Sequence, residues 1–248
     1  MNINFKNQNV LVTGATRGIG RQIAEDMLSC GANVIVTGTS KLSLENLTDD
    51  FLKFPVNFLN KKSSQDFIDF ISSKKIDVCI NNAGINKIDE IENINKEDWD
   101  SIIEVNLSTP FKIIKEVSKS MKKNGYGRIV NISSIWGVIS KEYRGPYSSS
   151  KFGLVGLTLA TAAELAKYNI LVNAVSPGFT LTDLTRNVLG QEEISKITQL
   201  IPAGRMGDPA DISKVVMFIA SRQNSYISGQ NIIVDGGFSN VWIEYIFI

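Results

Sequence analysis

A tyrosine and a lysine placed four residues apart are the side chains of this sequence best suited to proton chemistry. Tyr147 and Lys151 begin and end the segment YSSSK, and positions i and i+4 share one face of a helix. A free phenol has a pKa of about 10, so a nearby ammonium that favours the phenolate would bring this pKa toward neutrality. Such a pair can donate a proton to a carbonyl oxygen or accept one from an alcohol.

The composition excludes several other kinds of chemistry. The 248 residues include no histidine, which removes Ser-His-Asp and Cys-His nucleophile systems and histidine-ligated zinc. Cys30 and Cys79 form no CxxC pair, so neither a disulfide framework nor a metal site is expected. Lys and Arg number 26 against 25 Asp and Glu, and this balance argues against nucleic-acid or anionic-membrane partners.

Three glycines near the N-terminus have the spacing of a dinucleotide-binding turn. They follow a short apolar segment and precede a helical pattern that starts at Arg21. Gly14 permits the sharp turn, Gly18 allows backbone to approach a pyrophosphate, and Gly20 allows the helix to pack on the strand. The N-terminus of that helix offers unpaired N–H groups to phosphate. We expect this turn to bind cofactor through Gly14, Ala15, Thr16, Arg17, Gly18, Ile19 and Gly20.

The end of the second predicted strand favours NADP(H) over NAD(H). An acidic side chain at this point would bind the adenosine ribose of NAD and repel a 2′-phosphate. The segment TGTSK at 37–41 contains no acid, whereas Arg17, Thr39 and Ser40 could hold a 2′-phosphate. The alternative is that Arg17 is a solvated surface charge.

The elements that must position these residues follow an alternating pattern. Short β-branched runs alternate with helical patterns along the chain, which predicts an α/β fold with a Rossmann-type doubly wound sheet of seven parallel strands and helices on both faces. We expect one domain covering residues 1–248, with a helical flap at 183–200 and an apolar tail at 241–248. The strands are predicted at 9–13, 33–37, 54–57, 77–80, 127–132, 170–174 and 231–234. The helices are predicted at 18–29, 43–53, 63–73, 96–122, 146–167 and 209–220.

Five motifs in series carry a family resemblance. The glycine turn, NNAG at 81–84, a serine at 134, YxxxK at 147–151 and PGFTLT at 177–182 follow the predicted strands. In this order and spacing they resemble the single-domain short-chain dehydrogenase/reductase family over residues 5–240. The resemblance implies an NAD(P)-dependent oxidoreductase.

The resemblance also implies roles for individual residues. Tyr147 would be the general acid for carbonyl reduction or the base for alcohol oxidation, and Lys151 would bind the nicotinamide ribose. Ser134 would hydrogen-bond the substrate oxygen, and Asn106 would hold a water that links Lys151 to solvent. The alternatives are that Ser134 caps a turn, Asn106 pairs locally and Lys151 is a solvated charge. The implied cofactor contacts also include Asn57, Phe58, Asn82, Ala83, Gly84, Pro177, Gly178, Thr180 and Thr182.

The substrate is the least determined part of the prediction. Within the family, segments 170–179, 201–205 and 228–237 are most similar to 3-oxoacyl-acyl-carrier-protein reductases of fatty acid biosynthesis. The basic positions by which those enzymes meet the acidic carrier are Gly125 and Tyr168 here, although Lys122, Lys123 and Lys167 are nearby. Arg144 in the loop before Tyr147 would suit a carboxylate or phosphate, so a polar or anionic sugar derivative is an alternative substrate.

Assembly and location are also expectations at this point. Family members are commonly tetramers through their long fifth and sixth helices, so we expect a homo-oligomer, a tetramer or a dimer, with the tail 241–248 at an interface or against the flap. No export signal is visible and the apolar tail is far shorter than the ~20 residues of a membrane span, which predicts a cytoplasmic protein. A remote alternative is a regulatory protein that binds NADPH without catalysis.

Overall fold

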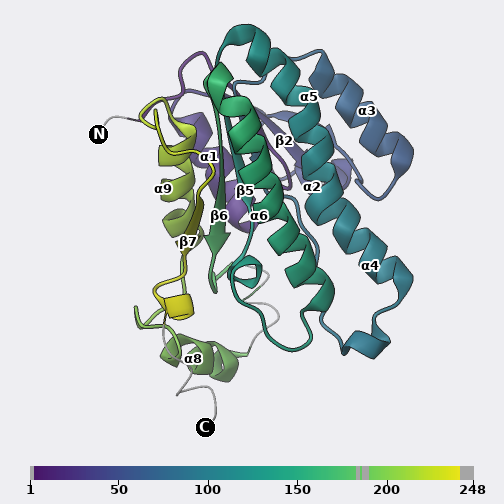
Figure 1. The fold of residues 1–248 in the computed structure, drawn as a ribbon, viewed down its shortest axis with the longest axis vertical. Helices are drawn as coiled ribbons and strands as arrows, with labels where there is room; N and C mark the ends of the chain where they lie inside the picture. The colour runs from purple at the N-terminus through teal and green to yellow at the C-terminus, as the bar shows by residue number, and fades with distance from the viewer. Residues whose placement is uncertain (1–2, 183–184, 186–189, 241–248) are drawn as a thin grey trace.

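The computed structural model describes residues 3–182, 185 and 190–240, and its centre is a seven-stranded parallel sheet (Figure 1). The strands lie in the order β3-β2-β1-β4-β5-β6-β7. The chain therefore runs outward from β1 to one edge and returns through β4 to the other edge. This topology confirms the predicted doubly wound sheet. The strands are β1 Asn9–Val12, β2 Asn33–Gly38, β3 Leu52–Pro55, β4 Val78–Asn81, β5 Gly127–Ile132, β6 Ile170–Pro177 and β7 Asn231–Val234.

Helices cover both faces of the sheet, and each face has its own apolar core (Figure 1). The first core lies under α1 and α9, which supply Ile23 and Val216. The second lies under α3, α5 and α6, which supply Phe67, Val117 and Leu165. All residues of β5 and β6 are buried, as is usual for strands covered on both faces. The helices are α1 Gly18–Ser29, α2 Lys41–Leu44, α3 Lys61–Ser72, α4 Lys96–Ile103, α5 Thr109–Asn124, α6 Gly145–Leu165, α8 Gln191–Gln199 and α9 Pro209–Ala220.

One helix prediction was wrong. The helix predicted at 43–53 is a single turn, Lys41–Leu44, and beyond it the Thr48 hydroxyl bonds to the Asp50 carboxylate and accepts the Asp50 backbone N–H. Such local bonds compete with helix formation, and β3 then begins at Leu52 and pairs with β2. The helix predicted at 96–122 is confirmed, and it contains a π-helical turn, Glu104–Ser108, between α4 and α5.

Part of the predicted C-terminal organisation lies outside the described residues. The flap predicted at 183–200 is described only at residue 185 and from residue 190, where α8 forms most of it. The apolar tail at 241–248 lies wholly outside the described ranges. No helix in those ranges combines the length and the apolar character needed to cross a lipid bilayer. The described side chains also contain no cluster of three or more His, Cys, Asp or Glu residues arranged to hold a metal ion.

Candidate active site

A cleft of about 430 Å³ opens at the carboxyl ends of β1 to β4. Many of the predicted cofactor residues line it, from the glycine turn to the NNAG motif. Six lining residues were not predicted, and most of them lie at or just after the carboxyl ends of strands: Thr37, Gly38, Val56, Leu59, Ile85 and Val105. The predicted residues that line it are Gly14, Thr16, Arg17, Gly18, Ile19, Gly20, Thr39, Asn57, Phe58, Asn82, Ala83, Gly84 and Thr182.

The glycine turn packs so closely that side chains cannot replace its hydrogens. A Cβ at Gly20 would lie 2.3 Å from Asn82 Nδ2 and 2.5 Å from the Gly14 carbonyl oxygen. Gly18 has a φ of 55°, in the left-handed region that favours glycine. The turn therefore presents bare backbone followed at once by the N-terminus of α1, an arrangement that fits a dinucleotide pyrophosphate.

Thr13 fixes this turn to the neighbouring strand, a role that the sequence analysis missed. Its Oγ1 accepts hydrogen bonds from the backbone N–H groups of Asn82 and Ala83, each at 3.0 Å. Asn82 Nδ2 in turn donates to the carbonyl oxygens of Thr13 at 3.0 Å and Gly14 at 2.9 Å. A hydroxyl at the last position of a strand pattern, directly before a glycine, is the signal that could have identified it.

Some predicted cofactor residues lie away from the cleft lining. Ser40 does not line it, because its hydroxyl caps α2 and accepts the Ser43 N–H at 3.2 Å. Ala15 is completely buried beneath the turn. Pro177, Gly178 and Thr180 lie at and beyond the end of β6, outside the lining.

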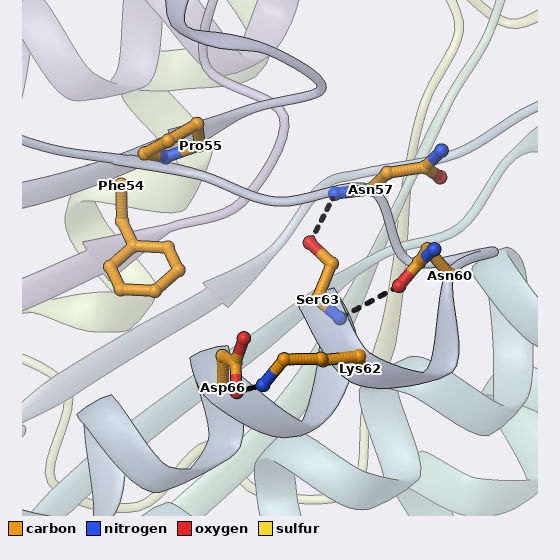
Figure 2. A pocket seen from close by; sticks show the side chains of 7 residues that line it. All are labelled: Phe54, Pro55, Asn57, Asn60, Lys62, Ser63 and Asp66. Carbon is orange, nitrogen blue, oxygen red and sulfur yellow. Dashed lines mark hydrogen bonds and ion pairs between the residues drawn. The ribbon is translucent and has the colours of Figure 1, made fainter.

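A second hollow lies beside this cleft, between β3 and the start of α3, and its polar groups already bind one another (Figure 2). The Ser63 hydroxyl accepts the Asn57 N–H at 3.0 Å, and the Asn60 side chain accepts the Ser63 N–H at 2.9 Å. Lys62 pairs with Asp66 at 3.2 Å. We therefore assign the ligand site to the first cleft.

The first turns of α6 place Lys151 behind Gly84 of the cleft, with Tyr147 beside it, although neither side chain lines the cleft itself. Lys151 is 3% exposed, and its Nζ donates to the Ile132 carbonyl at the end of β5 at 2.9 Å. The same Nζ lies 5.6 Å from the centroid of the Tyr147 ring. A Cβ at Gly84 would lie 3.6 Å from Lys151 Nζ and 3.4 Å from Asn106 Oδ1. The NNAG motif therefore joins the cleft to these side chains.

The pKa values of Tyr147 and Lys151 differ from the expectation. Burial raises the pKa of Tyr147 above its ordinary value, while a hydrogen bond with the Ser134 hydroxyl and the charge of Arg144 act in the opposite direction. Burial lowers the pKa of Lys151 to about 8. The expectation that Lys151 lowers the tyrosine pKa is thus corrected for the free protein, where Arg144 is the cation with that effect. Tyr147 is held as a phenol at neutral pH, which suits it to donate a proton.

Two consecutive serines after β5 fix this arrangement. Ser134 Oγ accepts the Trp136 N–H at 3.2 Å and so caps the short 3-10 helix Ile135–Gly137. Its hydroxyl hydrogen is not used in that bond and can be donated to a substrate oxygen. Ser133 donates to the Lys151 carbonyl at 3.1 Å. Ser134 therefore caps a turn, as the alternative interpretation expected. Its hydroxyl can also donate a hydrogen bond to a substrate oxygen.

Asn106 connects three parts of the site from within the π-helical turn. Its Nδ2 donates to the Ile85 carbonyl at 2.9 Å and to Ser150 Oγ at 3.0 Å, and its Oδ1 accepts the Ile85 N–H at 2.9 Å. Ser150 donates to the Tyr147 carbonyl at 2.7 Å. Both amide hydrogens of Asn106 are thus occupied, so only carbonyl lone pairs are left for the expected water.

Comparison with known proteins identifies the family. The family model described as enoyl-(acyl carrier protein) reductase matches residues 14–239. The 3-oxoacyl-acyl-carrier-protein reductase of Aquifex aeolicus strain VF5 is 40% identical over 96% of this chain and 99% of its own length. That of Escherichia coli K12 is 36% identical over 95% of this chain and 98% of its own. This chain belongs to the short-chain dehydrogenase/reductase family. The predicted family and the predicted NAD(P)-dependent enzyme are confirmed.

Solved structures of short-chain dehydrogenase/reductase proteins share the fold over nearly the whole chain. A short-chain type dehydrogenase/reductase from Mycobacterium marinum has a TM-score of 0.86 at 28% identity, covering 95% of this chain and 97% of that one. A gluconate 5-dehydrogenase from Burkholderia cenocepacia J2315, in complex with NADP and tartrate, has a TM-score of 0.88 at 26% identity. That comparison covers 97% of this chain and 98% of the other.

Proposed function

We propose that this protein is an NADP(H)-dependent reductase of 3-oxoacyl thioesters in fatty acid biosynthesis, interconverting a carbonyl group and a secondary alcohol. The observation that carries the proposal is the convergence of Ser134, Tyr147 and Lys151 beside the cleft, where Lys151 lies behind Gly84. The relatives named as 3-oxoacyl-acyl-carrier-protein reductases support the substrate class. We further propose a single catalytic domain over residues 1–248, located in the cytoplasm.

Each catalytic side chain has a separate role in the reaction at the carbonyl group. The glycine turn and Asn82 to Gly84 would hold the dinucleotide, which when bound would supply the hydride for the carbonyl carbon. Tyr147 donates its phenolic proton to the oxygen, while the Ser134 hydroxyl hydrogen-bonds the same oxygen as negative charge develops there. Lys151 binds the nicotinamide ribose hydroxyls. A water on a carbonyl of Asn106 returns the proton to Tyr147 by way of Lys151, and oxidation of the alcohol reverses each transfer.

The cofactor is NADP(H). Arg17 and Thr39 line the cleft near the carboxyl end of β2, where no acidic side chain precedes Glu45. An arginine and a hydroxyl suit a 2′-phosphate, whereas an acid would repel it. The Burkholderia relative is a complex with NADP. The predicted cofactor set stands as the proposed binding site, except that Ser40 serves the cap of α2 and that Ala15, Pro177, Gly178 and Thr180 lie outside the cleft lining.

A basic surface beside Tyr168 supports docking of an acidic acyl carrier. The ammonium groups of Lys122 and Lys167 lie 5.0 and 5.3 Å from the centroid of the Tyr168 ring. These lysines sit next to the two positions, Gly125 and Tyr168, at which the basic residues of the relatives are missing. Lys122 also pairs with Glu164 at 3.4 Å, so Lys167 is the better placed of the two to replace a missing charge in attracting an acidic partner.

A polar or anionic sugar derivative is the second candidate substrate. Its support is the position of Arg144, whose charge reaches Tyr147. The Burkholderia relative is named as a gluconate dehydrogenase and was solved with tartrate. The third hypothesis, a regulatory protein that binds NADPH without catalysis, has less support because such a protein needs none of the four catalytic side chains.

We also propose a homo-oligomer, a tetramer or a dimer, formed through α5 and α6. Three large apolar side chains of these helices are exposed: Phe111 at 51%, Phe152 at 46% and Leu159 at 53%. Apolar side chains in such a group are more often covered by a second copy of the chain than left in water.

Substitution of Tyr147 by phenylalanine tests the enzyme hypothesis. We expect Tyr147→Phe to lower kcat by about 100-fold or more, because the proton donor is lost, while NADPH affinity is unchanged. The assay follows NADPH oxidation with short 3-oxoacyl thioesters and with carboxylated keto-sugars, with NADH in parallel. Turnover that survives in Tyr147→Phe would contradict the assigned role. A preference for NADH would contradict the cofactor proposal, and NADPH binding without turnover of either pool would favour the regulatory hypothesis.

A further inference from the structure

Arg144 is a half-buried cation at the substrate side of the site. It precedes α6 and lies three residues before Tyr147. Its guanidinium carbon is 5.7 Å from the centroid of the Trp136 ring, which is within the range of a cation–π interaction. Its Nε is buried and has no hydrogen-bond partner among residues 3–182, 185 and 190–240. Stacking on Trp136 therefore positions the side chain, and its Nε–H is left to donate a hydrogen bond to a ligand.

An aromatic wall extends from Trp136 across the carboxyl edge of the sheet. Trp136 packs edge-to-face on Phe179 at 6.1 Å, and Phe179 packs edge-to-face on Phe238 at 5.1 Å. These three residues follow β5, β6 and β7 respectively. Trp136 is buried, Phe179 and Phe238 are partly buried, and Arg144 places one positive charge at the Trp136 end of this row, next to the proton donor.

The charge of Arg144 is only weakly compensated within the described chain. Burial lowers the pKa of its guanidinium, and only Tyr147 and Glu142 act in the opposite direction. The Glu142 carboxylate also forms an ion pair with the Lys141 ammonium, at 3.5 Å. A partly desolvated guanidinium with an unused N–H gains most from a bound anion, because charge-assisted hydrogen bonds replace the water that it has lost.

We propose that Arg144 binds a carboxylate of the substrate and so selects carbonyl compounds that carry one. This inference rests on the proposed carbonyl–alcohol chemistry at Tyr147 and specifies the second candidate substrate class. A carboxylate matches the single charge of Arg144. A phosphate dianion would leave one negative charge uncompensated, since the other charged group facing Arg144 is Glu142.

Matched pairs of oxo acids and their methyl esters test this proposal with the complete protein and NADPH. The panel contains 2-, 3- and 4-oxo acids of four to six carbons, the corresponding esters, short 3-oxoacyl thioesters and a phosphorylated oxo alcohol. We expect the wild type to prefer the acids, and Arg144→Met to lower kcat/KM for the best acid by about 10- to 100-fold. The same substitution changes kcat/KM for the ester by less than about twofold. Arg144→Lys restores part of the kcat/KM for the acid that Arg144→Met loses.

Lys141→Met is the matched control, because it removes an exposed cation from the same loop; it keeps the preference for acids. Binding of each acid is also measured by its effect on the fluorescence of enzyme-bound NADPH, which needs no turnover. Equal losses for acid and ester in Arg144→Met, or a wild type that prefers the esters or the phosphorylated compound, would overturn the carboxylate proposal. Turnover of neutral thioesters alone would overturn it and leave the proposed function standing. No turnover of any carbonyl compound would instead defeat the proposed function, and acid binding that depends on Arg144 would then still support this inference.

Discussion

Lys151 loses its charge within the range of ordinary buffers, because burial lowers the pKa of its ammonium to about 8. The ammonium binds the proposed ribose hydroxyls better than the neutral amine, so NADPH binding takes up a proton above this pH. Below about pH 8 both free and bound forms are protonated, and affinity is constant. Above it we expect the Kd for NADPH to rise by up to about tenfold per pH unit, measured by fluorescence titration on both sides of pH 8.

The control for this prediction is Lys151→Met, which removes the titrating group. We expect weaker NADPH binding at every pH and no slope above pH 8. A variant that keeps the slope of the wild type would show that another group titrates.

At the scale of single residues, chemistry that depends on type and spacing was predictable. The glycine turn and the Tyr147–Lys151 pair belong to this class, because each is defined by neighbours close in sequence. The role of Thr13 and the direction of the Tyr147 pKa were not predictable, since both depend on neighbours from other strands and on burial. Ser40 was assigned to the cofactor, yet its position before α2 made a cap equally available to it.

The π-helical turn Glu104–Ser108 is the element that holds the two halves of the site together through Asn106. Asn106→Ala would remove three hydrogen bonds and leave the N–H and C=O of Ile85 without these partners. We expect the free energy of unfolding to fall by about 2 to 4 kcal/mol, measured by denaturant titration, together with weaker NADPH binding.

Asn93→Ala provides the comparison for this element, because Asn93 is an exposed asparagine whose side chain reaches only Asp89, at 3.5 Å. We expect it to change stability by less than about 0.5 kcal/mol. Similar losses in both variants would mean that the three Asn106 bonds contribute little.

The interrupted helix explains a limit of prediction at this scale. The helical pattern of the sequence predicted a helix over 96–122, and the structure is helical there. A π turn inserts one extra residue without changing composition, so periodicity does not mark it. The helix predicted at 43–53 failed for another reason: Leu44, Leu47 and Phe51 are all buried, but only Leu44 lies in a helix, and the chain that brings the other two inward is not helical.

At the scale of the whole molecule, the proposed oligomer depends on the exposed apolar side chains of α5 and α6. A glutamate in place of Leu159 would put a charge into that contact at about two helical turns from Lys151. We expect Leu159→Glu to reduce the molar mass in light scattering to that of a smaller assembly.

Leu42→Glu is the control for this experiment, because Leu42 is 73% exposed on α2, away from α5 and α6. We expect it to leave the mass unchanged. A wild-type mass equal to one chain, or an unchanged mass in Leu159→Glu, would contradict an interface through these helices.

The strand order also affects how the chain matures during synthesis. β1 is the first strand made, yet it lies inside the sheet between β2 and β4. Its side toward β4 has no partner until Asn81 has emerged from the ribosome, so the nascent chain exposes an open hydrogen-bonding edge made of Val10, Leu11 and Val12. The interval between the synthesis of β1 and that of β4 is therefore when this protein is most open to unwanted strand pairing.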